Sequence, residues 1–320
     1  MAEVKTISIN NFTTDSGVVY DSINLHYQHF GQSFERAPVV LINHSLTGDS
    51  NVAGPQGWWS EIVGISRAID LNKFTVLCIN IPGNGFNEEN FNFNVELNLG
   101  DIANIFIKVL DKLKISKLHA VIGGSIGGCL TWEMAAIKND IAEKIIPVAS
   151  DWKANDWLIA NTFLQDRILE NSKDPIGDAR IHAMTFYRTP ESLNHRFSRS
   201  KNIEKGIYNV ESWLDHHAIK LNQRFSLNSY KFLNKLLRSA NITRDDSRLE
   251  SKIMPSKSEI HIISVDSDIF FLPDEDRMTT KRLKKQKVKI KNHIIESIHG
   301  HDAFLIETKQ ISDIFTKILT

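Results

Sequence analysis

Apolar residues follow strand-like patterns over much of the first half of the chain. Residues 3–30 alternate apolar and polar positions around Thr14–Gly17, which predicts an opening antiparallel hairpin. Four near-continuous apolar runs follow, of the kind found in strands that are buried on both faces of a sheet. These runs lie at residues 38–42, 74–81, 118–122 and 144–149.

Helical spacing separates these strand patterns. Asp101–Leu113 carries apolar residues three and four positions apart, which predicts an amphipathic helix, and residues 60–69 read as a shorter helix-like stretch. Near the end of the chain, Glu259–Val265 and His293–Ile298 predict two more strands, and Ala303–Leu319 a closing helix. Alternating strands and helices indicate parallel βαβ units, so the predicted fold class is α/β with helices on both faces of the sheet.

The pattern changes between Asp151 and about Arg248. Strand signals almost disappear there, and helical patterns follow one another, as in DWLIANTFLQDRIL and VESWLDHHAIKL. We therefore predict a helical lid inserted into an α/β core. The core comprises residues 1–150 and 255–320, and the lid residues 151–254.

The charge balance excludes some classes of partner. Lys plus Arg and Asp plus Glu both number 38, so the formal net charge is zero, which argues against a nucleic-acid-binding protein. The basic run Lys281–Lys291 is most simply a solvated helix face that leads into a strand, and steering of an anionic ligand is a second reading.

Hydrophobic residues make up 42% of the chain, an ordinary globular proportion. No run approaches the ~18 consecutive apolar residues of a membrane helix. The first residues, MAEVKTISINNF, lack the apolar stretch of a signal peptide. Cys78 and Cys129 provide neither a disulfide framework nor a metal-ligand spacing. We expect a cytoplasmic protein without a metal or a tightly held cofactor.

The glycine-rich segment Gly123–Gly128 carries the strongest chemical signal. It holds Ser125 in a G-x-S-x-G pattern between a predicted strand and a helical pattern, the context of a nucleophile elbow. Glycines on both sides allow a tight turn and close packing of the two elements. The helix N-terminus would favour negative charge developing at the serine. A glycine-rich turn with an incidental serine is the alternative.

A serine nucleophile needs a base, and the base needs an orienting acid. In sheets of this kind the order along the chain is Ser, Asp, His. Asp266 and Asp268 follow one predicted strand, and His299 and His301 follow the last, both at carboxyl ends of strands. The residues themselves leave the choice within each pair open.

An oxyanion hole in this arrangement uses two backbone N–H groups. One belongs to the residue after the nucleophile, Ile126. The other comes from the loop after an early strand, residues 44–48, where Leu46 is the predicted donor. His44 in that loop reads as an ordinary buried histidine that shapes it.

Several longer segments resemble one family. Together they span about Val40 to Glu307 and include the helical insertion, so they are far more specific than G-x-S-x-G. In chain order they read HSLTGD, GWWSEIVGISRAID, KLHAVIGGSIGG, YRTPES, YNVESWLDHHAIKL, RFSLNSY, VDSDIFF and GHDAFLIE. This series resembles the homoserine O-acetyltransferase family of the α/β-hydrolase fold.

The resemblance implies transfer of an acetyl group from acetyl-CoA to the hydroxyl of L-homoserine, a step of methionine biosynthesis. It implies a ping-pong route through an acyl-serine, with Ser125 as nucleophile, Asp268 as orienting acid and His301 as base. Asp302 matches the position that contacts the substrate amino group. Members of the family are typically homodimers joined through the helical insertion.

Three departures from the family pattern lie around the acceptor pocket. Ile81–Asn87 stands where the family has G-G-C-x-G-S-T-G-P, and the insertion is shorter between Leu169 and Ile181. A strict register places Asp166 at the family's substrate-carboxylate arginine, so we nominate its neighbour Arg167 for that contact.

Several other functions are compatible with the same fold. A succinyl donor or a serine acceptor is the nearest variant, because a few contacts decide such specificity. An esterase or thioesterase would use the same three residues with water as acceptor. A non-enzymatic relative of the fold would have a damaged triad, whereas this chain retains each predicted member.

Overall fold

The central feature of the computed structural model, which describes residues 2–86, 91–93 and 96–319, is one mostly parallel sheet. Counted across the sheet, the first three strands pair antiparallel with one another. Every further pair of neighbouring strands is parallel. In order across the sheet, the eight strands of the described residues are β1 (Lys5–Thr13), β2 (Val19–Gly31), β6 (Thr75–Ile79), β3 (Val39–Asn43), β7 (Leu118–Gly124), β8 (Ala142–Val148), β11 (Glu259–Val265) and β12 (Ile290–Ile295).

Strand burial explains why the apolar runs form the middle of the sheet. Every residue of β3 and β6 is buried, and successive side chains enter different hydrophobic cores. Val40 and Ile42 join one core, while Val39 and Leu41 join the other. The predicted hairpin, buried strands and α/β fold class are confirmed.

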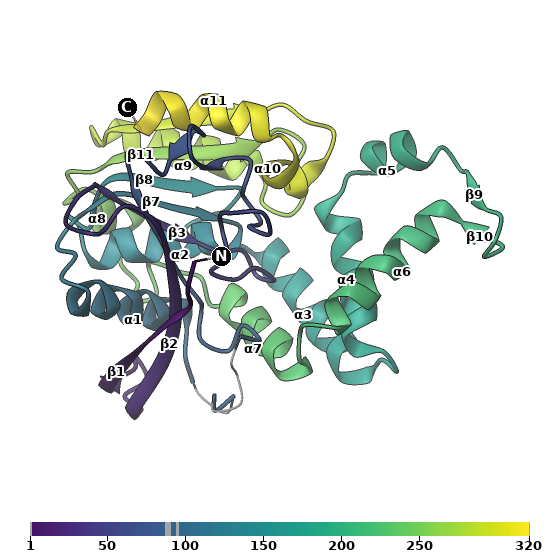
Figure 1. Ribbon diagram of the computed structural model, residues 1–320, viewed down its shortest axis with the longest axis horizontal. Coiled ribbons are helices and arrows are strands. Elements are labelled where there is room, and N and C mark those ends of the chain that lie inside the picture. Colours follow the sequence, from purple (N-terminus) through teal and green to yellow (C-terminus); the bar gives the residue numbers. More distant parts are fainter. Residues whose placement is uncertain (1, 87–90, 94–95, 320) are drawn as a thin grey trace.

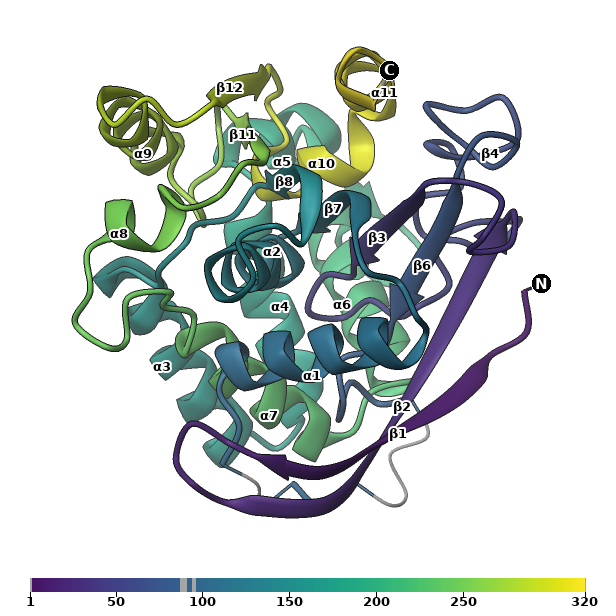
Figure 2. The ribbon, with the colours of Figure 1, turned by 90° about the vertical axis from the view of Figure 1, so that its left-hand side faces the viewer.

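Helices cover both faces of the sheet (Figure 2). α1 and α2 pack on one face, and α11 packs on the other through Ile311, Phe315 and Ile318. The helices of the core are α1 (Leu99–Lys112), α2 (Ile126–Ile137), α8 (Leu249–Ile253), α9 (Pro273–Lys285), α10 (Ala303–Ile306) and α11 (Thr308–Leu319). Within the described residues, no helix has the length and apolar character needed to span a bilayer.

The insertion forms a separate group of helices that extends beyond the sheet (Figure 1). α3 packs on α4 and α7, and α4 packs on α6. A short antiparallel ribbon, which the sequence patterns do not predict, interrupts the helices. The elements are α3 (Asp156–Asn171), α4 (Pro175–Tyr187), α5 (Pro190–Phe197), β9 (Lys201–Asn202), β10 (Ile207–Tyr208), α6 (Asn209–Asn222) and α7 (Leu227–Arg238). α8, which lies inside the predicted lid range, contacts α2 of the core.

The two ends of the insertion are joined to each other. A β-bridge pairs Lys153 with Asn241. Beside it, the N–H of Ala154 donates to the carbonyl of Ala240 at 2.8 Å, and that of Ile242 to the carbonyl of Trp152 at 3.2 Å. The inserted helices therefore leave and re-enter the core at one place.

The helix predicted over residues 60–69 is wrong. That segment consists of turns and two parallel two-residue strands, β4 (Val63–Gly64) and β5 (Ile69–Asp70). Ile62, Val63 and Ile69 are buried because they pack on the face of the sheet covered by α11. The preceding Trp59 contacts Phe315 of α11 with ring centroids 5.6 Å apart. Ser66, at φ 57°, breaks any helical path.

The last strand and the closing helix also differ from the expectation. β12 begins at Ile290, inside the basic run, and ends at Ile295, three residues before the predicted end. The basic residues of α9 are exposed, as predicted for a solvated helix face. The closing helix is divided into α10 and α11 by Glu307, whose ψ of 52° is not helical.

Candidate active site

Ser125 occupies a strained turn between β7 and α2. Its φ of 58° and ψ of −126° are unfavourable for a residue with a side chain, and its N–H donates to the carbonyl of Val148 at 3.0 Å. The glycines on either side permit this turn. A Cβ on Gly127 would lie 2.2 Å from the carbonyl oxygen of Asn43, and one on Gly123 would lie 2.0 Å from the oxygen of Gly127. The packed backbones hold the serine at the carboxyl end of β7.

A continuous hydrogen-bonded relay reaches Ser125. The Nδ1 of His301 lies 2.7 Å from Oδ2 of Asp268, and its Nε2 lies 3.0 Å from the Oγ of Ser125. Because an ionised carboxylate can only accept, Nδ1–H donates to Asp268 and Nε2 accepts from the serine hydroxyl. Ser125, His301 and Asp268 are 5%, 2% and 3% exposed, so the relay is shielded from water.

The structure brings Asp268 into the relay rather than Asp266. Oδ1 of Asp268 accepts from the N–H groups of Phe270 at 2.7 Å and Phe271 at 3.0 Å, which fixes the carboxylate toward the imidazole. Asp266 instead accepts from the N–H of Ser297 at 3.0 Å and ties the two loops together.

His301, rather than His299, is the histidine of the relay, and it lies among aromatic rings. The rings of Tyr187, Phe270, Phe271 and Phe304 have centroids 5.2–5.5 Å from that of His301. Burial raises the pKa of Tyr187 to about 12, so its phenol is neutral at physiological pH. These rings restrict water around the imidazole and hold it in one orientation.

The predicted oxyanion donors lie at the same end of the sheet. Ile126 is the first residue of α2, where backbone N–H groups have no acceptor within the helix. Leu46 lies in the loop after β3, which adjoins the start of α2 because Asn43 pairs with Gly123 in the register of β3 and β7. Leu46 is 6% exposed and faces a small cavity under the insertion.

His44 maintains this loop. Its Nδ1 donates to the carbonyl of Ser45 at 2.8 Å, and its Nε2 accepts from the N–H of Ile81 at 2.9 Å. Burial lowers the pKa of His44, so the ring stays neutral and can accept that bond. The histidine thereby joins the loop after β3 to the loop after β6.

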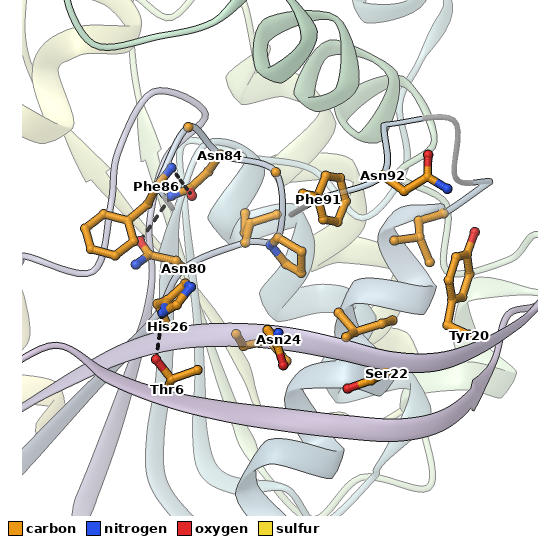
Figure 3. A pocket seen from close by; sticks show the side chains of 17 residues that line it. Thr6, Tyr20, Ser22, Asn24, His26, Asn80, Asn84, Phe86, Phe91 and Asn92 are labelled. Atoms are coloured by element: carbon orange, nitrogen blue, oxygen red, sulfur yellow. Dashed lines mark hydrogen bonds between the residues drawn. The ribbon is translucent and has the colours of Figure 1, made fainter. Parts of the chain in front are cut away.

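A cavity of about 640 Å³ lies between β2 and the loop after β6 (Figure 3). Neutral polar side chains line much of it, among them Tyr20, Asn24 and His26 from β2. Asn84 lines this cavity and also donates to the carbonyl of Gly48, at 3.3 Å, in the loop that carries Leu46. Of the loop Ile81–Asn87 that departs from the family pattern, Asn87 lies outside the described residues.

A second cavity, of about 20 Å³, lies next to the relay. It is enclosed between the core and the helices α3, α4 and α7. Its lining includes Leu46, Gln165, Tyr187, Tyr230 and Phe270, two of which contact the ring of His301. The insertion therefore roofs the relay closely.

The two predicted substrate contacts have different positions. Asp302 directly follows His301, and its Oδ2 accepts from Nε of Arg188 at 2.9 Å. Arg167, however, is exposed on α3, where its guanidinium lies 3.9 Å from Glu170, and the structure does not bring it to the relay. Asp166, the residue in strict register, pairs with Arg238 at 2.6 Å. The nomination of Arg167 is not supported, because its side chain lies on the exposed side of α3.

Arg180 on α4 is a site residue that the sequence reasoning missed. Its guanidinium lies 5.8 Å from the centroid of Tyr187, the ring that contacts His301. In the described part of the chain it forms no ion pair. A usable signal was present, since Arg180 precedes Tyr187 by seven residues, two helical turns on the same face.

Comparison with known proteins places the chain in a class. A family model described as alpha/beta hydrolase fold matches residues 38–307. The structure of homoserine O-acetyltransferase from Bacillus anthracis superposes with a TM-score of 0.89 at 18% identity, covering 100% of this chain and 98% of that one. That of esterase E22 superposes with a TM-score of 0.88 at 18% identity, covering 100% of both chains. The protein belongs to the α/β-hydrolase-fold family.

Sequence relatives narrow the class further. The homoserine O-acetyltransferase of Cyclobacterium marinum is 30% identical over 93% of this chain and 89% of its own length. That of Methanococcus vannielii is 28% identical over 99% of this chain and 73% of its own. The chain is a member of the homoserine O-acetyltransferase family.

The two neighbouring carboxylates provide a direct test of the relay. We expect Asp268→Asn to lower the turnover of p-nitrophenyl acetate by about 10⁴-fold, because the imidazole loses its orienting acceptor. Asp266→Asn serves as the matched control and should change the rate less than about threefold, because the amide oxygen can still accept from the N–H of Ser297. Equal losses in both variants, or a larger loss in the control, would contradict the assignment.

Proposed function

We propose that this protein is a homoserine O-acetyltransferase that transfers an acetyl group from acetyl-CoA to the hydroxyl of L-homoserine. The observation that carries the proposal is a pair of opposite charges beside the Ser125 relay. Asp302 adjoins His301 in sequence, and Arg180 lies over the ring of Tyr187. An amino-acid acceptor presents an ammonium and a carboxylate, which such a pair would bind.

In the first half-reaction, His301 takes the hydroxyl proton of Ser125 at Nε2 as the serine oxygen attacks the thioester carbonyl carbon. The N–H groups of Ile126 and Leu46 stabilise the oxyanion. The C–S bond then breaks, the CoA sulfur takes the proton from His301, and an acetyl-serine remains. Asp268 stabilises the imidazolium throughout.

In the second half-reaction, His301 takes the proton of the homoserine hydroxyl, and that oxygen attacks the acetyl-serine. The bond to the serine oxygen breaks, and Ser125 recovers its proton from His301. Transfer rather than hydrolysis requires water to be excluded and the acceptor to be oriented. The aromatic enclosure of His301 and the closely fitting insertion support this requirement.

Esterase activity is the second candidate, because esterase E22 has the same fold over the full chain. It would use the same acyl-enzyme with water as acceptor. Asp302 and Arg180 favour the transferase, since a water acceptor needs neither charge.

A paired assay of thiol release and product decides between these activities. Wild-type protein with acetyl-CoA and L-homoserine should form O-acetylhomoserine in step with free CoA, with succinyl-CoA, serine and water alone as comparison arms. Ser125→Ala should remove the burst of CoA and lower the rate by about 10⁶-fold, because the acyl-enzyme cannot form. CoA released at an undiminished rate without an acylated amino acid would instead identify a hydrolase.

Arg180 is proposed to bind the acceptor carboxylate. Arg180→Gln should raise the KM for L-homoserine about 10–100-fold, because a charged hydrogen bond is lost, and leave acetylation of Ser125 nearly unchanged. Arg167→Gln is the matched control on the exposed side of α3 and should leave the KM unchanged. Steady-state kinetics with homoserine varied at saturating acetyl-CoA measure both, and an effect of Arg167 alone would contradict the proposal.

We further propose that two copies associate through the insertion. α3 exposes a row of apolar side chains, with Ile159 39%, Phe163 60% and Leu164 45% exposed. Exposed apolar groups of this kind are typical of interfaces.

Phe163→Glu should convert a dimer to a monomer in sedimentation velocity, because it places a charge within that row. Ile65→Glu, at a 70% exposed position on the core, is the control and should leave the mass unchanged. A monomeric wild-type protein would contradict this proposal.

A further inference from the structure

The insertion and the loop that carries His301 interlock at one place. The side chain of Ser192, in the first turn of α5, contacts His299, with Ser192 Oγ 2.8 Å from His299 Nδ1. The hydroxyl of Thr189 donates to the carbonyl of Ile298. Gly300, at φ 66°, approaches so closely that a Cβ there would lie 3.1 Å from the carbonyl oxygen of Tyr187. Hydrogen bonds and close packing therefore join the insertion to this loop.

Arg188 lies at the centre of this contact. It directly follows α4 as the C-cap residue, and it is 9% exposed. Its Nε donates to Asp302 at 2.9 Å, and its Nη1 lies 3.4 Å from both Ser192 Oγ and His299 Nδ1. Its guanidinium also lies 5.7 Å from the ring centroid of Trp213 on α6. The side chain thus contacts four residues, which hold it in one orientation.

The ion pair with Asp302 uses one carboxylate oxygen. Only Nε of Arg188 donates to it, through Oδ2, and no other hydrogen bond to this carboxylate occurs among the residues the structure describes. Oδ1 is therefore left to accept from a second cation. A carboxylate can bind two donors, and the first fixes the direction in which the second must approach.

We propose that Arg188 is a positioning residue that orients Asp302 toward the ammonium group of the acceptor, and so couples the insertion to the choice of acceptor. This inference rests on the proposed function, because it requires an acceptor that carries an ammonium group. Arg188 acts through Asp302 and touches no reacting atom. Specificity for an amino-acid acceptor then depends on a residue of the insertion that lies outside the relay.

The test compares two acceptors that differ in the ammonium group alone, L-homoserine and 4-hydroxybutanoate. Arg188→Gln should lower the preference for homoserine, as a ratio of kcat/KM values, by about 10–100-fold, the effect of a lost charged hydrogen bond. Arg188→Lys keeps the cation and should recover part of that ratio. Arg196→Gln is the matched control, because Arg196 also lies over the ring of Trp213, at 5.3 Å, but forms no bond to Asp302.

A second readout uses p-nitrophenyl acetate, which reports acylation of Ser125 in a transferase or an esterase alike. Arg188→Gln should lower this rate far less than it lowers kcat/KM for L-homoserine, because the ester carries no ammonium group. Equal losses with both acceptors, without recovery in Arg188→Lys, would overturn the proposal and indicate a merely structural role.

The two readouts also separate this proposal from the proposed function. If the wild-type protein acetylates neither acceptor, both the transferase assignment and this proposal fail. If the wild-type protein prefers homoserine and Arg188→Gln keeps that preference, this proposal alone fails. If Arg188→Gln does not fold, as judged by circular dichroism, Arg188→Lys replaces it. Its acceptor ratio must then fall in the same direction, and an unchanged ratio overturns the proposal.

Discussion

The strained conformation of Ser125 is the constraint on which the site depends. A side chain at φ 58° is stable only where neighbouring backbones leave the chain no other path. Here β7, α2 and the end of β3 approach within distances that leave no room for a Cβ at Gly123 or Gly127. The same approach positions the loop of Leu46 beside the start of α2. One packing arrangement therefore positions both the nucleophile and its expected oxyanion donors.

The other members of the relay come from chain segments far apart in sequence, and the sheet brings them together. β11 and β12 are neighbours in register, so the loops that follow them meet at the same edge as the β7–α2 turn. Hydrogen bonds between these loops, such as that from Ser297 to Asp266, keep His301 and Asp268 at a fixed separation. The insertion then covers this edge, and Tyr187 and Arg188 carry its contacts to the base and to Asp302.

Local patterns predict those parts of the molecule that local interactions decide. Strands buried on both faces, the opening hairpin and the glycine-rich turn follow from the chain itself. The choice between Asp266 and Asp268 does not follow from the chain itself. It depends on which carboxylate accepts hydrogen bonds from the N–H groups of Phe270 and Phe271. The pattern of residues 60–69 predicts a helix that does not form, since Ile62, Val63 and Ile69 are instead buried on the face of the sheet that α11, from the far end of the chain, covers. Arg167 was nominated by register along one helix, whereas the packing of α3 on α4 directs Arg180 toward the site.

The joined ends of the insertion have a consequence for how such proteins diversify. Trp152, Ala154, Ala240 and Ile242 close the inserted segment with backbone hydrogen bonds that are independent of side-chain identity. Helices between these points can be lengthened, shortened or exchanged while β8 and β11 keep their register. The core can thus carry alternative insertions. A lineage can acquire specificity for a new acceptor by changes within the insertion alone. Any new insertion must again supply side chains that contact the loop of His301.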